Sequence, residues 1–178
     1  MSALSALPVT GLHVVSRGQA GASEPGAVRG KLPLMYGDPV SWLVTEAVSR
    51  ALAAGADQIL TARDDVGVIL VSARCTLKTM REVRRSSATG RVSPMRFTGA
   101  SPGSAGSLVC MVHRLTGPTL TLVNDPAVGL GVAATIARAW LVSKAAAYVV
   151  VTAHEVSAAG EDVAESVVVS DRQQERET

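Results

Sequence analysis

Two patterns of apolar residues divide the chain into predicted helices and strands. Beginning at Asp38-Pro39, apolar residues recur at intervals of three and four and predict a helix that ends near Gly55. Asp38 can cap this helix, and Pro39 suits its first turn, where a missing N–H costs nothing. Helices are also predicted over three further segments, 77–85, 104–115 and 127–144.

Runs of consecutive apolar residues, rich in valine, predict strands that are buried on both faces. Strands are expected at 8–15, 66–71, 119–123, 148–152 and 165–170, the last as an edge or pairing strand. Loops are expected at 16–31, which is rich in glycine, and at 86–102. Strands that alternate with helices indicate an α/β layered fold. We expect one domain over 1–178, with its core at about 9–170 and a charged tail at 171–178.

Composition narrows the class of protein. Hydrophobic residues make up 47% of the chain, but only one Phe, two Tyr and two Trp are present, so the core must be aliphatic. No apolar run is long enough to span a membrane, and residues 1–8 lack the features of a signal peptide. A net charge of +2 is too small to favour nucleic acid as a partner. Two cysteines form no disulfide framework, which favours a reducing, cytoplasmic location.

Four segments of the chain resemble motifs that one enzyme family carries in the same order. VTGLHVVS at 9–16 resembles an opening strand TGxGxVSPxG, and DDVGVILVS at 64–72 resembles a second strand. RVSPMRF at 91–97, continuing to GPTLTL at 117–122, resembles VSPxxFPNxxPNxxAGxxAxxxGLxGPxxTV. Residues 139–155 resemble a helix and strand that end in GxADxxLxGGxE. The family is that of the β-ketoacyl synthases. The resemblance implies half of a thiolase-like layered fold, a mixed sheet with helices on its faces.

The resemblance departs from the family at the position of the catalytic nucleophile. The family continues GPxxTVSTACASG, and its Cys takes up the acyl chain. Here the run is GPTLTLVNDPAVG, which places Pro126 at the Cys position and keeps Gly129 in register. Proline has neither a thiol nor a backbone N–H to hold an oxyanion, and the family's chemistry needs both. Chain-length-factor relatives carry Gln at this position, which is also missing here.

The second departure is in length. The catalytic histidines and lysine of the family lie in the C-terminal half of its double fold, and this chain ends at 178. Short chain-length-factor-like proteins of aryl-polyene and related pathways are similar in this respect. The resemblance therefore implies a non-catalytic, chain-length-factor-like subunit. It would pair with a ketosynthase in polyketide, polyene or fatty-acid-type chain assembly, as in antibiotic biosynthesis.

The resemblance also implies which residues meet a partner. In the family, the strand before the nucleophile pairs with its counterpart across a dimer. The expected partner is therefore a full-length ketosynthase or a second copy of this chain. The corresponding interface residues are Thr119, Leu120, Thr121, Leu122 and Val123. Phe97 lies in the family's loop near the acyl cavity, where it either lines a pocket or packs in the core.

Two alternative functions remain open. One is an enzyme with a repurposed site around Asn124, Asp125 and His154, and the other is an acyl-binding, self-associating protein. His154 follows a strand end, where functional groups collect in α/β folds. A hydrogen-bonded structural histidine is the simpler explanation of that position.

The remaining candidates are a basic cluster, two cysteines and three histidines. The cluster is either a solvated face or a docking surface for an acidic acyl carrier protein. It consists of Lys78, Arg81, Arg84, Arg85 and Arg91. Cys75 and Cys110 fit as small buried hydrophobes, although Arg74 could make Cys75 reactive. The histidines, at 13, 113 and 154, have no metal-ligand spacing, so neither a metal nor another cofactor is expected.

Overall fold

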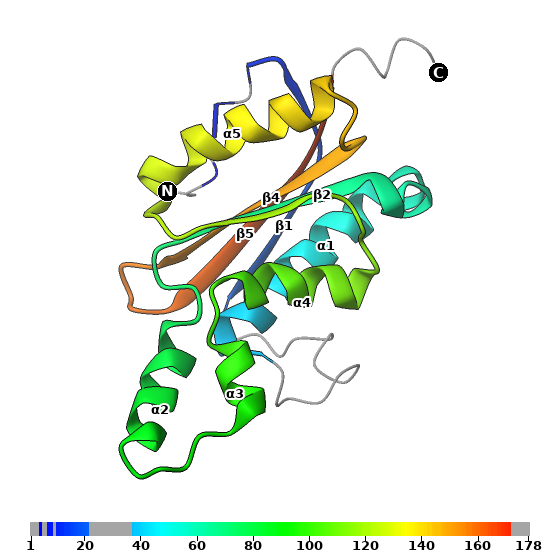
Figure 1. Cartoon of the computed structure of the whole chain (residues 1–178). Helices are drawn as coiled ribbons and strands as arrows, with labels where there is room; N and C mark the ends of the chain where they lie inside the picture. The colour runs from blue at the N-terminus through cyan, green and yellow to red at the C-terminus, as the bar shows by residue number, and fades with distance from the viewer. Residues whose placement is uncertain (1–3, 5–6, 9, 22–36, 172–178) are drawn as a thin grey trace.

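The structure, a computed structural model, describes residue 4 and residues 7–8, 10–21 and 37–171 (Figure 1). In chain order the elements are β1 (Leu12–Gly21), α1 (Pro39–Thr61), η4 (Arg63–Asp65), β2 (Val66–Ser72), α2 (Leu77–Ser87), α3 (Pro94–Gly99), α4 (Gly103–His113), β3 (Thr119–Leu122), α5 (Pro126–Val142), β4 (Tyr148–Val156) and β5 (Asp162–Asp171). Strands and helices alternate through the middle of the chain, as the apolar pattern predicts.

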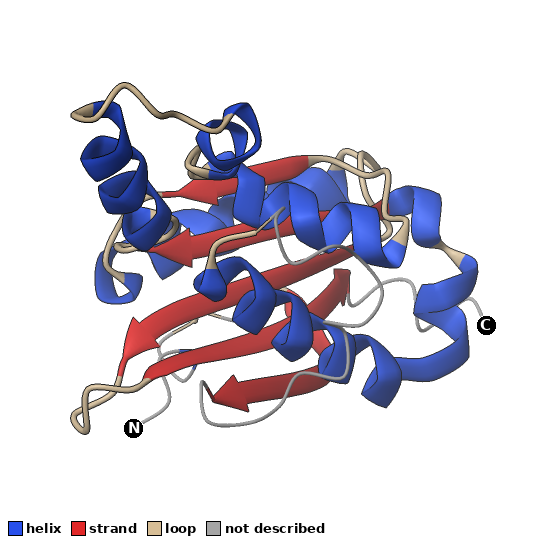
Figure 2. Cartoon of the chain, turned by 90° about the horizontal axis from the view of Figure 1, so that it is seen from below, coloured by secondary structure: helices blue, strands red, loops and turns tan. Residues whose placement is uncertain are grey.

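The described strands lie side by side in a single sheet (Figure 2). The sheet has five strands in the order β1-β5-β4-β2-β3. β4, β2 and β3 run parallel to one another, whereas β5 runs antiparallel to both of its neighbours. The sheet is therefore mixed, and within the described residues β1 and β3 form its two edges. β5, expected as an edge or pairing strand, lies inside the sheet and pairs on both sides.

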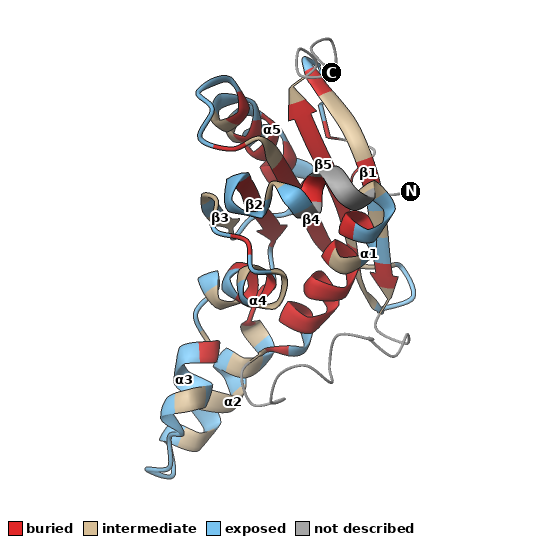
Figure 3. Ribbon diagram, turned by 90° about the vertical axis from the view of Figure 1, so that its right-hand side faces the viewer, coloured by how far each residue is buried: buried red, intermediate tan, exposed pale blue. Residues whose placement is uncertain are grey.

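Helices cover both faces of the sheet (Figure 3). The side chains of β2 alternate between two aliphatic clusters: Val68 and Leu70 face α1 and α4, while Ile69 and Val71 face α5. All seven residues of β2 are buried, as expected for a parallel strand that is covered on both sides. The predicted α/β layered fold, a mixed sheet with helices on its faces, is confirmed.

Two glycines allow close packing where the sequence suggested something else. Gly18 lies in the predicted loop, and Gly55 is the predicted end of the first helix. β1 continues to Gly21, through the first part of the predicted loop; the rest of that loop lies outside the described residues. A Cβ at Gly18 would lie 2.3 Å from both the Ala47 carbonyl oxygen and the Ala51 amide nitrogen, so the glycine lets β1 touch α1. α1 likewise runs past Gly55 to Thr61.

Other parts of the structure also differ from the prediction. The segment predicted as a loop at 86–102 contains α3, with Pro94 in the first turn. α4 ends at His113, because Arg114 adopts a left-handed conformation (φ 55°). β3, expected as a strand buried on both faces, is partly exposed because it forms an edge. The charged tail lies outside the described residues, apart from Asp171.

Candidate functional site

The turn from β3 into α5 has the form that the sequence predicts. β3 ends at Leu122, and Asp125 caps α5 by accepting a hydrogen bond from the Ala127 N–H (2.9 Å). Pro126 is buried as the first residue of the helix. Gly129 packs directly on β2, because a Cβ there would lie 2.5 Å from Cγ1 of Val71. The turn is thus a tight strand-to-helix junction with a proline at its centre.

This junction carries no nucleophile. Pro126 has no side-chain proton to transfer and no N–H that could hold a developing negative charge. Asn124 and Asp125 are exposed, and the Asp125 carboxylate already accepts from the helix backbone. The junction can therefore begin a helix, but the groups of a thioester-forming site are missing from it.

The five expected interface residues lie along and just beyond the edge strand. Within the described residues β3 pairs with β2 alone. Leu120 and Leu122 are partly buried against the cluster beneath α5, whereas Thr119 and Val123 are exposed. The outer side of β3 therefore offers backbone N–H and C=O groups to a further strand.

An apolar stripe on α5 lies beside this edge. Val128, Val132, Ile136 and Trp140 recur every four residues and share one face of the helix. Val128 is 68% exposed and Val132 is 49% exposed, whereas the other two are partly buried. Trp140 lies over Gly67, next to the Pro118 carbonyl that leads into β3, which places the stripe on the β3 side of α5.

A buried hydrogen-bond relay joins the ends of β2, β4 and β5. Ser72 Oγ lies 2.8 Å from His154 Nδ1, and His154 Nε2 lies 3.2 Å from Asp162 Oδ1. Ser72 Oγ also accepts the Cys75 N–H at 2.8 Å, so its own proton is free to be donated to His154. Sequence analysis found His154 but missed Ser72 and Asp162, which are neighbours only because β2, β4 and β5 lie side by side.

The relay resembles a Ser-His-Asp triad but is closed to a substrate. His154 is 1% exposed and Ser72 is fully buried. Burial lowers the pKa of His154, and the hydrogen bond that His154 makes to the Asp162 carboxylate opposes that shift only in part. The neutral imidazole therefore accepts from Ser72 and donates to Asp162. The relay holds the turn after β2, where Cys75 adopts a positive φ of 34°.

Both cysteines are poorly placed for reaction. Burial raises the pKa of the Cys75 thiol, with a smaller opposing effect from the Ser72 hydrogen bond. Burial also raises the pKa of Cys110, whose sulfur lies 3.4 Å from Thr119 Oγ1. A thiol with a raised pKa forms little thiolate near neutral pH, so both fit the structural interpretation.

The other predicted residues are dispersed. Phe97 is 65% exposed on α3, Asn124 and Asp125 lie at the β3–α5 junction, and His154 is buried in the relay. The structure therefore does not bring these four together around one pocket. His113 Nε2 contacts Ser49 Oγ at 3.0 Å. Among the described residues, no group of His, Cys, Asp or Glu is placed to hold a metal, and no helix could cross a membrane.

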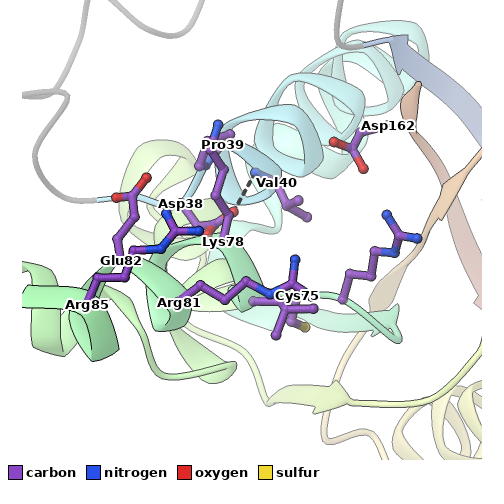
Figure 4. A pocket seen from close by; sticks show the side chains of 11 residues that line it. Asp38, Pro39, Val40, Cys75, Lys78, Arg81, Glu82, Arg85 and Asp162 are labelled. Carbon is purple, nitrogen blue, oxygen red and sulfur yellow. Dashed lines mark hydrogen bonds between the residues drawn. The ribbon is translucent and has the colours of Figure 1, made fainter. Parts of the chain in front are cut away.

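Only some residues of the predicted basic cluster line a common cavity. Lys78, Arg81 and Arg85 line a cavity of about 470 Å³ between α2, the start of α1 and the start of β5 (Figure 4). Arg74, from the turn after β2, lines the same cavity. Arg84 belongs to α2 but does not line it.

The chain resembles known proteins in its three-dimensional structure but not in its sequence. No protein-family model and no curated protein matches the sequence. Solved structures do match: the ishigamide ketosynthase/chain length factor aligns with a TM-score of 0.72 over 91% of this chain and 62% of that one, at 16% identity. The chain has the ketosynthase fold. This is the thiolase-like fold that the sequence motifs imply.

Two further ketosynthase structures agree. A ketosynthase in complex with its chain length factor from Xenorhabdus doucetiae aligns with a TM-score of 0.65 over 90% of this chain and 79% of that one, at 12% identity. A type II polyketide synthase ketosynthase bound to a hexaketide, in complex with its acyl carrier protein, aligns with a TM-score of 0.71 at 13% identity. The alignment covers 93% of this chain and 64% of that one. The chain thus spans under two thirds of the length of the first and third of these ketosynthase-fold chains.

Proposed function

We propose that this chain is a non-catalytic, chain-length-factor-like subunit that pairs with a ketosynthase in the assembly of polyketide, polyene or fatty-acid-type chains. One observation carries the proposal: within a ketosynthase fold, Pro126 occupies the first turn of the helix that follows edge strand β3. The motif resemblance places the nucleophilic cysteine at this residue. A proline there keeps the helix start and removes the chemistry.

The surface beside this junction supports pairing with another chain. β3 is an unpaired edge within the described residues, and the exposed end of the α5 stripe, Val128 and Val132, continues the apolar surface next to it. An open strand edge beside exposed valines favours association, since a second strand satisfies the backbone and covers the side chains. A ketosynthase is the proposed partner, and a two-fold homodimer is the simplest arrangement when the chain is alone.

A second contact with an acidic acyl carrier protein belongs to the same proposal. α2 carries Lys78, Arg81, Arg84 and Arg85, and none of its residues is buried. A helix of this kind attracts an acidic partner by complementary charge, and the attraction weakens as salt rises.

The pairing surface is tested by replacing exposed valines with lysine. Val128→Lys places a charge beside β3, whereas Val142→Lys alters an equally exposed valine (66%) that lines a cavity with β1 residues at the other end of α5. We expect Val128→Lys to weaken association at least about tenfold, because a charge would be desolvated at the interface. Val142→Lys should leave association unchanged.

Two measurements decide the proposal. Light scattering reports self-association, and co-purification with a co-expressed ketosynthase reports hetero-association. The isolated chain should not condense malonyl and acyl thioesters. The proposal is wrong if the wild-type chain is a monomer at micromolar concentration and also fails to bind the ketosynthase, or if the isolated chain catalyses condensation.

A further inference from the structure

The cavity beside α2 collects cationic side chains from two elements. Lys78, Arg81 and Arg85 are spaced by three and four residues and so share one face of the helix (Figure 4). Arg74, from the turn after β2, lines the same cavity. The cavity volume of about 470 Å³ falls within the range of about 300–1,000 Å³ that is usual for small-molecule sites.

The four cations have no partner within the described part of the chain, whereas the acids that share their cavity do. No hydrogen bond or ion pair in that part of the structure involves the side chain of Arg74, Lys78, Arg81 or Arg85. Asp38 is buried and accepts from two backbone amides, those of Val40 and Thr79, at 2.9 Å each. Glu82 pairs with Arg96 (3.4 Å), and Asp162 with His154 (3.2 Å). The cavity therefore has unused donors and few free acceptors.

The charge balance favours an anion. Four cations and three acids line the cavity, and one of those acids, Glu82, is already paired with Arg96, which lies outside the lining. The four lining cations therefore face two remaining acids, Asp38 and Asp162, which leaves an excess of two positive charges. A phosphate monoester carries about −1.5 to −2 at pH 7, which would neutralise that excess. Arginine is also well suited to phosphate, because its planar fork donates two parallel hydrogen bonds.

The hydrogen-bond relay helps to fix the backbone of the turn that lines the cavity. The relay fixes the turn that carries Arg74, because Ser72 Oγ accepts the N–H of Cys75, the next residue. The Arg74 carbonyl in turn accepts from the Leu77 N–H at 2.7 Å, at the start of α2. The backbone at Arg74 and the first turn of α2 are thus fixed before a ligand arrives, so that binding has only the cationic side chains to order.

From this arrangement we infer that the α2 cavity binds the phosphate group of a small phosphate ester. Among the residues that the structure describes, Pro39, Val40 and Leu77 supply the apolar lining, and no aromatic side chain lines the cavity. An aliphatic body therefore fits beside the phosphate better than a nucleobase, which would need a ring to stack on. The inference goes beyond the proposed pairing role and does not depend on it.

The test is titration calorimetry on the full chain with inorganic phosphate, glycerol 3-phosphate and glycerol. We expect glycerol 3-phosphate to bind and glycerol not to bind. Binding of inorganic phosphate with similar affinity would show that the phosphate group alone is recognised. Clearly weaker binding of inorganic phosphate would show that the aliphatic body contributes. Absence of binding by both phosphate compounds at millimolar concentration would overturn the inference.

Variants of α2 locate the site. Arg81→Ala and Arg85→Ala should each weaken glycerol 3-phosphate binding at least about tenfold, because each removes a charge-assisted contact. Arg84→Ala is the matched control, from the same helix but outside the cavity, and should change binding less than about twofold. Alanine suits a helix at all three positions, and circular dichroism checks that the fold is kept. Equal losses in all three variants would show a diffuse basic surface instead of a site.

Discussion

Replacing Ser72 with alanine is expected to destabilise the fold through the buried relay. The hydroxyl has two partners: it accepts the Cys75 N–H at 2.8 Å and lies 2.8 Å from His154 Nδ1. Ser72→Ala removes these two hydrogen bonds in a place where Ser72 and His154 are themselves buried. The change is otherwise small in volume, so the lost hydrogen bonds dominate the effect.

The magnitude follows from the cost of unpaired buried groups. Each such group costs about 1–3 kcal/mol. Partial reorientation of the imidazole would recover some of this, so we expect a loss of about 2–4 kcal/mol in the free energy of unfolding. For a chain of this size, a loss of about 1 kcal/mol lowers Tm by about 2–4 °C, which gives an expected decrease of about 4–16 °C.

Urea unfolding and thermal melting measure this change, and amide hydrogen exchange localises it. The Cys75 amide should exchange slowly in the wild type and faster in Ser72→Ala. Ser107→Ala is the matched control: its exposed hydroxyl contacts only the Gly103 carbonyl on α4, so stability should change by less than about 0.5 kcal/mol. A Ser72→Ala variant as stable as this control would refute the argument that the relay supports the turn.

Three further predictions follow from the same structure. Because burial lowers the pKa of His154 from its ordinary 6.5, the unfolded chain binds a proton below about pH 6.5 that the folded chain does not. The urea concentration at the unfolding midpoint should therefore decrease as the pH is lowered from 7.5 to 5.5. This decrease should be smaller in His154→Gln. Gly18→Val should destabilise the fold by about 3 kcal/mol or more, since its side chain would meet the α1 backbone, and a thermal melt unchanged from wild type would contradict this. Asp125→Ala should cost about 1 kcal/mol through loss of the α5 cap without abolishing association with a partner; a loss of activity with an intact fold would instead favour a repurposed enzyme.

The layered fold could be predicted from the sequence because its main signals are local. The continuous apolar run of β2 and the Asp125-Pro126 pair each indicate their own structure without reference to other segments. Gly18 misled the prediction for the opposite reason: the chain shows a glycine, and only the approach of α1 shows why a side chain is excluded.

The sites were harder to predict because they depend on neighbours in space. Ser72 and Asp162 form the relay only when β2, β4 and β5 are adjacent. The basic residues of α2 were found by composition, but only helix geometry separates Arg81 and Arg85 from Arg84. Edge position is likewise a property of strand order, so an apolar run alone could not show that β3 is half exposed.

The pairing of β1 with β5 also sets the order in which a newly synthesised chain can fold. In the register of these strands Leu12 lies opposite Asp171, so about 150 further residues must be synthesised before the only described strand that pairs with β1 is available. At about 5–20 residues per second, the delay is on the order of ten seconds. α1 packs on both strands and must also wait for β5. A ribosome-bound chain that stops before β5 should therefore expose the apolar sides of β1 and α1, and it is the form that we expect chaperones to hold.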